Sequence, residues 1–513
     1  MARRAGRRDG RAAVTPRPTR LSAAQLVELV LDDGSWTSWD VPVVRGELDP
    51  EYAAELVAAE ERSGVDESVV TGAGTVNGRR VAVLAGEFAY LAGSIGTAAA
   101  ERLVLAIERA TAEGLPLLAA PVSGGTRMQE GTAAFVRMVD ITAAICRHKD
   151  AGHPYLVYLR HPTTGGVMAS WGSLGHVTVA EPGALVGFLG PRVYEALYGK
   201  PFPEGVQTSE NLFAHGLVDA VLPPEDLQEI VHRALEVLTA PRDPDENPLA
   251  QSPDRTPQTV PSGDAWESVT RSRDDRRPGA RRLLRLAATD VIPLNGTGEG
   301  ETDPGLLLAL ARFGGAPCVV LAQDRRGQTR ERPLGPGALR EARRGMRLAA
   351  ELRLPLVTVI DTPGAALSVE AEEGGLAGEI ARCLADLVML EAPTLTVLLG
   401  QGTGGGALAL LPADRVVAAQ HAWLSPLPPE GASAIRHRTP DRAAEMARAQ
   451  GVGSASLQAS GVVDRVVAET VDAAEDPDGF CLTLGEVVRH ELYGLMRRDD
   501  DERMAARRTR YRS

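Results

Sequence analysis

Three short motifs occur twice in this chain, in the same order and at almost the same separation. The pairs are residues 123–125 (Ser-Gly-Gly) and 361–364 (Asp-Thr-Pro-Gly), residues 163–166 (Thr-Thr-Gly-Gly) and 402–406 (Gly-Thr-Gly-Gly-Gly), and residues 216–221 (Gly-Leu-Val-Asp-Ala-Val) and 461–466 (Gly-Val-Val-Asp-Arg-Val). Their offsets are 239, 240 and 245 residues. A nearly constant offset predicts a tandem duplication, so we expect the chain to fold as two similar halves.

Composition separates the two halves. From residue 241 onward a stretch is rich in Pro, Asp, Arg, Ser and Gln and poor in apolar residues, which is typical of a linker. The first 20 residues carry seven arginines and one acid with no apolar run after them. This pattern predicts a disordered basic tail and no secretory signal, with a transit peptide as the alternative. The predicted boundaries are a basic tail at 1–20, an N-terminal domain at 21–240, a linker at 241–264, a C-terminal domain at 265–495 and a frayed, charged tail at 496–513.

Charge and cysteine content exclude several classes of protein. A net charge of −13 argues against nucleic-acid binding, and no apolar run reaches the roughly 18 residues that a membrane span needs. The cysteines are too widely spaced for a zinc ribbon or a disulfide framework, and they predict single buried thiols in a reducing cytoplasm. These cysteines are Cys146, Cys318, Cys383 and Cys481.

Short apolar runs alternate with amphipathic stretches in each half. This alternation predicts an α/β fold in which helices cover parallel β-sheets. One amphipathic stretch follows residues 123–125, and its apolar residues recur at helical spacing, which predicts one helix face packed in the core. That face comprises Phe135, Met138, Val139, Thr142 and Ile145 or Cys146.

Each half has two places where an apolar strand ends in glycines before a predicted helix. Glycine allows unusual φ angles and a close approach of other atoms, and the first amides of a helix lack intrahelical partners. Two such amides directed at one point form an oxyanion hole, which contributes about 3–4 kcal/mol per donor in comparable sites. The enolate of a thioester is an intermediate that needs this arrangement.

Other cofactor and catalytic motifs are missing or incomplete. Residues 400–405 match G-x-G-x-x-G, but residues 418–429 contain none of the acidic residues that a dinucleotide site needs about 20 positions later. The sequence has no G-x-x-x-x-G-K-[ST] phosphate loop and no G-x-S-x-G elbow, and the nine histidines show neither metal-ligand nor triad spacing. The pattern therefore indicates an enzyme that acts through backbone amides, with no metal.

The aligned glycine motifs resemble a known family. The first half resembles the beta subunit of bacterial acetyl-CoA carboxylase carboxyltransferase, through residues 87–96, 123–131, 162–167 and 180–192. The second half resembles the alpha subunit, through residues 361–365, 371–373, 404–409 and 429–431. The resemblance covers about 20–235 and 265–490, so the chain looks like the beta and alpha subunits of this biotin-dependent enzyme fused in one polypeptide.

The resemblance implies two tandem crotonase-like domains built from repeated ββα units. In this family the N-terminal half holds the acyl-CoA, the C-terminal half holds carboxybiotin, and the active site lies between halves of different protomers. We therefore expect a homo-oligomer, at least a dimer, in the cytoplasm. The chain has no Met-Lys-Met biotinylation site and no ATP-grasp signature, so biotin is expected on a separate carrier protein charged by a separate biotin carboxylase.

The family's roles carry over by position. Gly165 and Gly166 would stabilise the thioester enolate, and Gly405 and Gly406 would hold the ureido oxygen of biotin. Gly124, Gly125 and Gly364 would line the same cleft, and the ureido nitrogen of biotin would be the base. Two further candidates, Arg127 and Arg192, would contact CoA phosphates or a substrate carboxylate, with a surface ion pair as the alternative.

The sequence departs from the family mainly in the second half. Residues 374–376 are Gly-Gly-Leu where Arg-Gly-Gln is usual, residues 366–367 are Ala-Leu where an aromatic residue and Pro are usual, and residues 436–438 are Arg-His-Arg where apolar residues are usual. We expect transfer of CO2 from carboxybiotin to a short acyl-CoA, acetyl-CoA giving malonyl-CoA. The alternatives are a biotin-independent decarboxylase of malonyl-type thioesters and a non-catalytic homologue. Fatty-acid and polyketide precursor supply both remain open.

Overall fold

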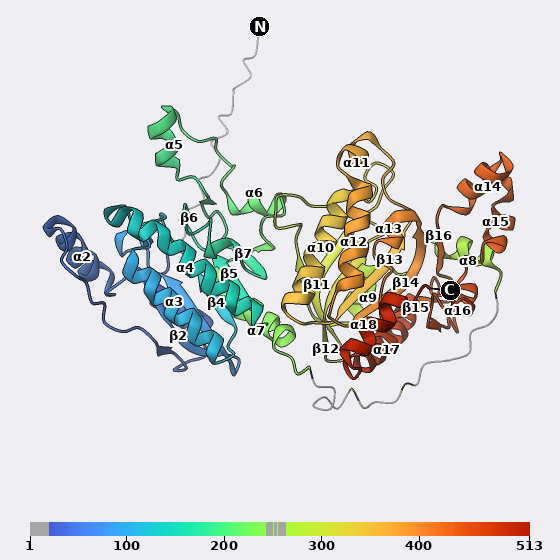
Figure 1. The fold of residues 1–513 in the computed structure, drawn as a ribbon, viewed down its shortest axis with the longest axis horizontal. Coiled ribbons are helices and arrows are strands. Elements are labelled where there is room, and N and C mark those ends of the chain that lie inside the picture. The colour runs from blue at the N-terminus through green and yellow to red at the C-terminus, as the bar shows by residue number, and fades with distance from the viewer. Residues whose placement is uncertain (1–19, 243–249, 251–253, 255–262, 513) are drawn as a thin grey trace, which may run out of the picture.

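The computed structural model describes residues 20–242, 250, 254 and 263–512, without the side chains of Pro191 and Arg192. Residues 1–19 of the predicted tail at 1–20 and most of the predicted linker at 241–264 therefore lie outside the described residues. Figure 1 shows an elongated molecule in which two α/β halves lie side by side along the long axis. The predicted α/β class, with parallel strands covered by helices, is confirmed.

The N-terminal half is built on a seven-stranded sheet in the order β1-β2-β3-β4-β5-β7-β9. β1–β2 and β2–β3 pair antiparallel, and every later pair is parallel. A short parallel pair, β6 with β8, extends beyond the end of β5. The strands are β1 (Thr37–Ser38), β2 (Val69–Val76), β3 (Arg79–Gly86), β4 (Leu117–Ala120), β5 (Tyr155–Leu159), β6 (Thr163–Thr164), β7 (Val177–Ala180), β8 (Val186–Gly187) and β9 (Ala220–Val221).

The C-terminal half repeats this plan with the same strand directions. Its sheet runs β10-β11-β12-β13-β14-β15-β17, antiparallel up to β12 and parallel afterwards, and β16 pairs with the end of β14 as β8 pairs with β6. The strands are β10 (Thr289–Leu294), β11 (Leu306–Phe313), β12 (Ala316–Gln323), β13 (Leu356–Thr362), β14 (Thr394–Thr403), β15 (Arg415–Ala419), β16 (Trp423–Ser425) and β17 (Arg465–Val467). The two sheets therefore confirm the tandem duplication.

The helices begin and end at residues that the sequence supplies for this purpose. α2 starts with Asp49 accepting from the amide of Glu51 and with Pro50 in its first turn, and it ends at the left-handed Gly64. The helices are α1 (Ala23–Val30), α2 (Pro50–Ser63), α3 (Thr97–Ala112), α4 (Gly131–Asp150), α5 (Pro191–Tyr198), α6 (Ser209–Ala214), α7 (Leu227–Leu238), α8 (Ala265–Ser272), α9 (Ala280–Ala287), α10 (Pro336–Glu351), α11 (Val369–Glu373), α12 (Leu376–Met389), α13 (Gly404–Leu408), α14 (Pro429–His437), α15 (Ala443–Ala449), α16 (Ser454–Ala459), α17 (Pro477–Met496) and α18 (Asp500–Thr509). None of the helices described is both long and apolar enough to cross a bilayer.

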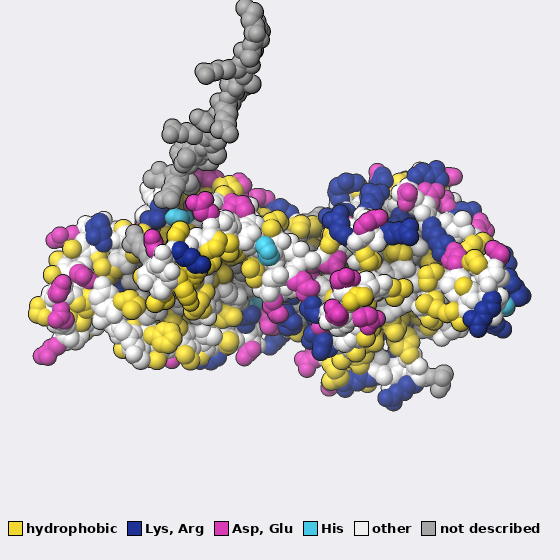
Figure 2. Space-filling view, turned by 90° about the horizontal axis from the view of Figure 1, so that it is seen from above, with side chains coloured by type: hydrophobic (Ala, Val, Ile, Leu, Met, Phe, Trp, Pro, Cys, Tyr) yellow, Lys and Arg dark blue, Asp and Glu magenta, His cyan; other side chains and the backbone are white. Residues whose placement is uncertain are grey.

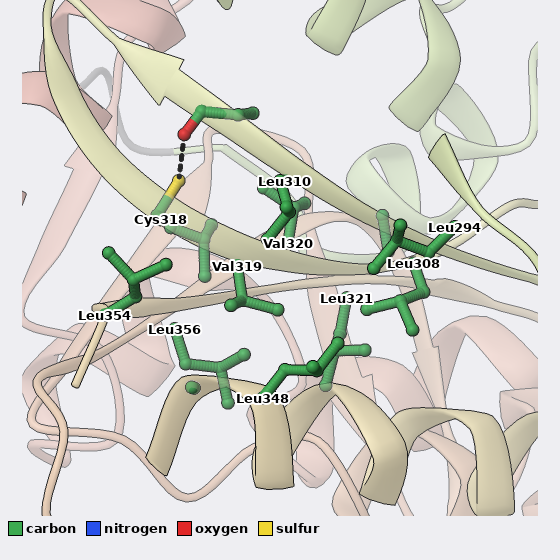
Figure 3. Packing of buried hydrophobic residues seen from close by; sticks show 14 of the residues in the cluster. Leu294, Leu308, Leu310, Cys318, Val319, Val320, Leu321, Leu348, Leu354 and Leu356 are labelled. Carbon is green, nitrogen blue, oxygen red and sulfur yellow. Dashed lines mark hydrogen bonds between the residues drawn. The ribbon is translucent and has the colours of Figure 1, made fainter. Parts of the chain in front are cut away.

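The core of the C-terminal half lies between its sheet and α10. Figure 3 shows leucines and valines of β11, β12 and β13 packed over Leu348 of α10, with the Cys318 thiol directed at the Ala311 carbonyl oxygen. The buried strands read as continuous apolar runs because both faces of a parallel sheet are covered. Cys318, Cys383 and Cys481 are buried free thiols as predicted, whereas Cys146 is exposed, so the prediction is wrong for that residue.

One apolar core runs through both halves. Val231 and Leu235 of α7 belong to the same buried cluster as residues of both sheets. Beside it, the Asp219 carboxylate joins the halves, because it accepts from the Thr178 amide at 2.8 Å, from the Asn295 amide at 3.0 Å and from Arg344 at 2.8 and 3.0 Å. The equivalent Asp464 accepts from the Val416 amide at 2.7 Å. The repeated Val-Asp motif therefore fixes the strand beside it in each half.

Two predictions about helices are wrong in part. α4 forms as expected, and Met138 and Ile145 are buried, but Phe135 and Val139 are exposed to solvent in the single chain. The C-terminal tail, expected to fray, contains α18. Arg503 and Arg507 of this helix insert fully buried guanidinium groups next to Asp414, with nitrogen–oxygen distances of 3.0 and 2.6 Å. Arg507 also donates to carbonyl oxygens at the end of α12, so α18 is part of the folded core.

Candidate functional site

In the N-terminal half, two glycine turns meet at the carboxyl ends of β4 and β5. Ser123 pairs with Thr163 in a parallel bridge, which places Gly125 (φ +115°) beside Gly165 (φ +65°). A Cβ on Gly165 would lie 3.2 Å from the Gly125 Cα. Glycine is therefore required at this position both for the left-handed backbone and for the close approach.

The C-terminal half repeats the turns residue for residue. Thr362 pairs with Gly402 as Ser123 pairs with Thr163, and the hydroxyl oxygen of Thr362 accepts from the Gly364 amide at 3.1 Å. A Cβ on Gly364 (φ +132°) would lie 3.6 Å from the Thr403 side chain. In Figure 1, β6 of the first half and α13 of the second both lie toward the upper side of the molecule.

The exact equivalence corrects one sequence pairing. The bridges Ile95–Thr126 and Leu334–Ala365 are 239 residues apart, as are Ser123–Thr163 and Thr362–Gly402. At this offset Gly165 corresponds to Gly404, and both have left-handed φ angles of +65° and +66°. The sequence motifs pair Gly165 with Gly405 and Gly166 with Gly406, at an offset of 240 residues. This pairing is wrong by one residue, and Gly166 corresponds to Gly405.

Each pair of turns presents backbone N–H groups without protein acceptors. Among the described residues, no hydrogen bond is formed by the amides of Thr126 and Gly166 in the first half or of Ala365 and Gly405 in the second. The two turns that carry them are in contact, because a Cβ on Gly166 would lie 3.0 Å from the Thr126 hydroxyl oxygen. In contrast, the amides of Gly124, Gly125 and Gly165 already donate to the Ala92 carbonyl oxygen, the Ser123 hydroxyl oxygen and the Phe188 carbonyl oxygen, respectively.

The sequence predicts that each of the four glycine turns leads directly into a helix, and this prediction holds for one of the four turns. α13 begins directly at Gly404, but it has only five residues. Gly165 and Gly166 begin a hydrogen-bonded turn rather than a helix, and α4 and α11 start several residues after Gly125 and Gly364. The donors are therefore unpaired amides held by strand ends, with little contribution from a helix dipole.

A buried carboxyl group, that of Asp361, lies next to the glycine turns of the C-terminal half. Asp361 is the last residue but one of β13, next to the turn, and accepts from the Gln401 amide at 3.1 Å. Burial raises the pKa of Asp361 to about 6, although the Arg325 guanidinium lies 3.8 Å away. Its oxygen occupies the space that a Cβ on Gly400 would take, so this glycine and this aspartate fix the two strands relative to each other.

Arg127 is a structural residue rather than a substrate contact. Its side chain has 0% exposure and forms an ion pair with Glu67 through both terminal nitrogens, one of them at 3.0 Å, and it donates to the Ser94 carbonyl oxygen at 2.8 Å. Burial disfavours the charged form, but hydrogen bonds to Glu67 and Tyr52 outweigh it and raise the pKa of Arg127. The predicted contact with CoA phosphates or a substrate carboxylate is therefore wrong for this residue, and so is the alternative of a surface ion pair. Arg192 lies in the first turn of α5, and its side chain is outside the description.

A residue that sequence reasoning missed lies beside the first site. A cavity of about 460 Å³ is lined by Arg62 of α2 and by Leu91, Ala92 and Ser94 of the turn that accepts from the Gly124 amide. Leu91 and Ala92 have left-handed φ angles of +43° and +56°, which side chains rarely adopt and which cluster at functional sites. Arg62 is exposed and donates to the Ala89 carbonyl oxygen. No motif marks Arg62, because its relation to the turn arises from the fold.

A larger cavity, of about 720 Å³, contains none of the glycine turns. It lies between the segment 39–48 and α3, and it reaches Tyr52 and Glu130. The hydroxyl of Tyr52 donates to Glu130 at 2.5 Å, and Glu130 accepts from the Thr97 amide at 2.6 Å, so the polar groups at this end are satisfied. The cavity is separate from the paired turns.

One group of potential metal ligands occurs in the described part of the chain. It consists of His421, Glu469 and Asp472. Arg277 forms ion pairs with both carboxylates, at 2.5 and 3.1 Å, so a cation already neutralises the group. A metal ion would have to displace this arginine.

Similarity to known proteins covers almost the whole chain. Residues 19–492 match the carboxyl transferase domain family. A probable biotin-dependent acyl-coenzyme A carboxylase beta3 subunit from Mycobacterium tuberculosis is 58% identical over 494 residues, covering 96% of this chain and 98% of the relative. The acetyl-coenzyme A carboxylase carboxyl transferase subunits beta/alpha of Salinispora tropica are 36% identical over 516 residues, covering 96% and 90%.

A solved structure has the same fold. Transcarboxylase 12S, crystallised as a hexamer with hydrolysed methylmalonyl-coenzyme A, superposes with a TM-score of 0.71 at 22% identity, covering 93% of this chain and 90% of its own. At this identity the likeness concerns the fold alone. The chain belongs to the carboxyl transferase domain family, as a carboxyltransferase of the biotin-dependent acyl-CoA carboxylases with a beta-like and an alpha-like half in one polypeptide.

Proposed function

We propose that this chain transfers a carboxyl group from biotin on a separate carrier protein to the α-carbon of a short acyl-CoA, with acetyl-CoA giving malonyl-CoA. The observation that carries the proposal is the duplication of two contacting glycine turns with unpaired amides, one set in each half. Acetyl-CoA is favoured because the Salinispora tropica relative, whose name joins beta and alpha subunits, is named for it. Biotin carboxyl carrier protein and biotin carboxylase are the proposed partners.

The first set of turns suits the acyl-CoA. The amides of Gly166 and Thr126 are free to donate to one thioester oxygen, and charge on that oxygen increases when the α-proton leaves. Donors that are already in place stabilise this enolate more than the neutral thioester, which lowers the barrier. Gly124, Gly125 and Gly165 shape the turn and allow the close approach.

The second set fits a neutral ureido oxygen. Gly405 and Gly406 present amides and no side chain, because a Cβ on Gly405 would lie 2.7 Å from Ile380 and one on Gly406 would lie 3.4 Å from the Ala365 amide nitrogen. Carboxybiotin, when bound, supplies the carboxyl group and a ureido nitrogen as base. The amides of Gly405, Gly406 and the turn at Gly364 would hold and orient it.

Oligomer formation would bring the two sets together. Apolar side chains are exposed around the turns of both halves, and one chain leaves them uncovered. They are Met128, Phe135, Val136 and Val139 in the first half and Leu367, Val369 and Leu408 in the second. We infer at least a dimer of crotonase-like domains, 21–240 and 265–495, in which each site combines the first half of one protomer with the second half of its partner.

Arg62 is proposed to hold the phosphates of CoA. We expect Arg62→Ala to raise KM for acetyl-CoA about tenfold with little change in kcat, because a lost charge-assisted hydrogen bond weakens ground and transition states alike. Steady-state kinetics at varied acetyl-CoA measures this. Acetyl-pantetheine, which lacks the nucleotide phosphates, should not distinguish variant from parent. Arg147→Ala is the matched control, since Arg147 is exposed on α4 and pairs with Glu108; an equal rise in KM for that variant would contradict the assignment.

The proposed reaction is tested with the purified chain, a biotinylated carrier domain, biotin carboxylase, ATP and labelled bicarbonate. We expect label in malonyl-CoA only when carrier and acetyl-CoA are both present. Release of CO2 from malonyl-CoA without any biotin would instead identify a decarboxylase. Inactivity with the cognate carrier and a series of short acyl-CoAs would identify a non-catalytic homologue.

A further inference from the structure

The exposed face of α14 combines apolar and cationic side chains. Gly431 lies against Leu427, with an ideal Cβ 3.9 Å from the Leu427 Cβ, and Ile435 follows one helical turn later. Ile435 is 65% exposed and Leu427 is 41% exposed. Arg438 closes the helix in a left-handed conformation, three residues after Ile435. We call this surface the α14 face, defined by Leu427, Gly431, Ile435, Arg436 and Arg438.

The two arginines of the α14 face are unusual in their surroundings. Arg436 and Arg438 are exposed, and among the described residues their side chains form no ion pair. Nearby arginines are neutralised: Arg442 pairs with Glu445 at 2.6 Å and Arg448 pairs with Asp264 at 2.7 Å. Figure 2 shows Lys and Arg side chains gathered at this end of the molecule, although the whole chain carries a net charge of −13. The helix dipole attracts cations to a C-terminus but does not explain the exposed Ile435.

The α14 face adjoins the second set of glycine turns. β16 pairs with β14 up to Thr403 and Ser425, and a Cβ on Gly404 would lie 3.4 Å from the Pro426 carbonyl oxygen. The Ser425 hydroxyl donates to the Leu427 carbonyl oxygen at 2.6 Å, and α14 begins two residues later. A macromolecule bound to this face would therefore be anchored directly beside Gly404–Gly406.

Charge identifies the kind of partner. Free arginines around an apolar centre favour a surface with carboxylates around an apolar patch. The exposed apolar patch on α4 of a second copy fits less well, because its acidic neighbours Glu101 and Asp140 both pair with Arg137 of the same chain. We propose that the α14 face docks an acidic carrier domain and so delivers its biotin to the second set of turns. This inference rests on the proposed function.

The test compares Arg436→Glu/Arg438→Glu with Arg285→Glu/Arg498→Glu, which changes net charge equally at exposed arginines of α9 and the end of α17. The probe is a biotinylated carrier domain with an acidic surface, titrated against the full-length protein by calorimetry at two salt concentrations. We expect the first variant to bind the carrier about tenfold or more weakly, with a flatter salt dependence, and the second to bind like the parent. The rate of carboxyl transfer from malonyl-CoA to free biotin should be the same in the parent and in both variants.

Each other result has a definite meaning. Equal carrier affinity in both variants, or no binding by the parent, would overturn the docking assignment. A shift of the first variant to smaller species in sedimentation would identify the α14 face as a contact between copies and overturn it too. Failure of the proposed function can be distinguished from failure of the docking assignment. If the proposed function is wrong, the parent would transfer a carboxyl group to neither free nor carrier-bound biotin, whatever its affinity for the carrier.

Discussion

Replacing Gly165 by Ala is expected to lower the rate of carboxyl transfer about 100- to 1,000-fold, the usual cost of disabling one oxyanion-hole donor. The new Cβ would lie 3.2 Å from the Gly125 Cα, closer than most Cβ contacts, so the two turns must separate. Separation moves the Gly166 amide away from that of Thr126. Because we propose that both donors reach one oxygen during catalysis, the loss should appear in kcat more than in KM.

Gly183→Ala is the matched control for this prediction. Gly183 has a left-handed φ of +66°, nearly the same as the +65° of Gly165, but no atom lies within 4 Å of its ideal Cβ. Both variants therefore carry a similar backbone strain of about 1–2 kcal/mol, and only one disturbs the paired turns. Thermal unfolding midpoints of the two variants should agree. A rate for Gly165→Ala within threefold of the control would contradict the role assigned to the turns.

Replacing Asp414 by Ala is expected to lower the free energy of unfolding by about 3–5 kcal/mol, the typical cost of leaving buried charges without their partner. Asp414 is the common acceptor for Arg503 and Arg507 and also accepts from the Thr394 amide at 2.7 Å. Without it, the buried guanidinium group of Arg507 keeps only carbonyl acceptors, and that of Arg503 keeps carbonyl acceptors and the exposed Asp500. α18 should then detach from the end of α12, and denaturant unfolding followed by circular dichroism would measure the loss.

Asp500→Ala separates the buried contact from a surface one. Asp500 pairs with the same Arg503 at 2.7 Å, but its side chain is 81% exposed. Exposed ion pairs contribute less than about 1 kcal/mol, so this variant should unfold almost like the parent. Equal losses for Asp414→Ala and Asp500→Ala would contradict the larger contribution assigned to the buried contact.

The repeated motifs predicted the architecture because each marks a structural constraint. Glycines stand where strands end and another backbone approaches, and the repeated Asp219 and Asp464 each accept from the amide of a neighbouring strand. The exact register could not be predicted in the same way. Three consecutive glycines at 404–406 offer several alignments with Gly165 and Gly166, and only the strand bridges and the φ angles of the folded chain distinguish them.

Long-range partners explain the remaining errors. Arg127 stands next to a glycine turn in sequence, but its partner Glu67 is 60 residues away and buried. The arginines of α18 suggested a solvated tail because Asp414 is far from them in sequence. The spacing of Phe135 and Val139 correctly predicted a helix; periodicity identifies residues that share a face but not what covers that face.

The buried contacts of α7 affect the order of events during synthesis. α7 completes the first half of the polypeptide, yet Val231 and Leu235 share a core with strands that leave the ribosome later. A nascent chain that ends near the junction of the two halves therefore exposes the apolar surface of α7 until β10 to β12 emerge and cover it. Slow translation or truncation within this window would favour capture by chaperones or aggregation, so the fusion also commits both halves to mature together in equal numbers.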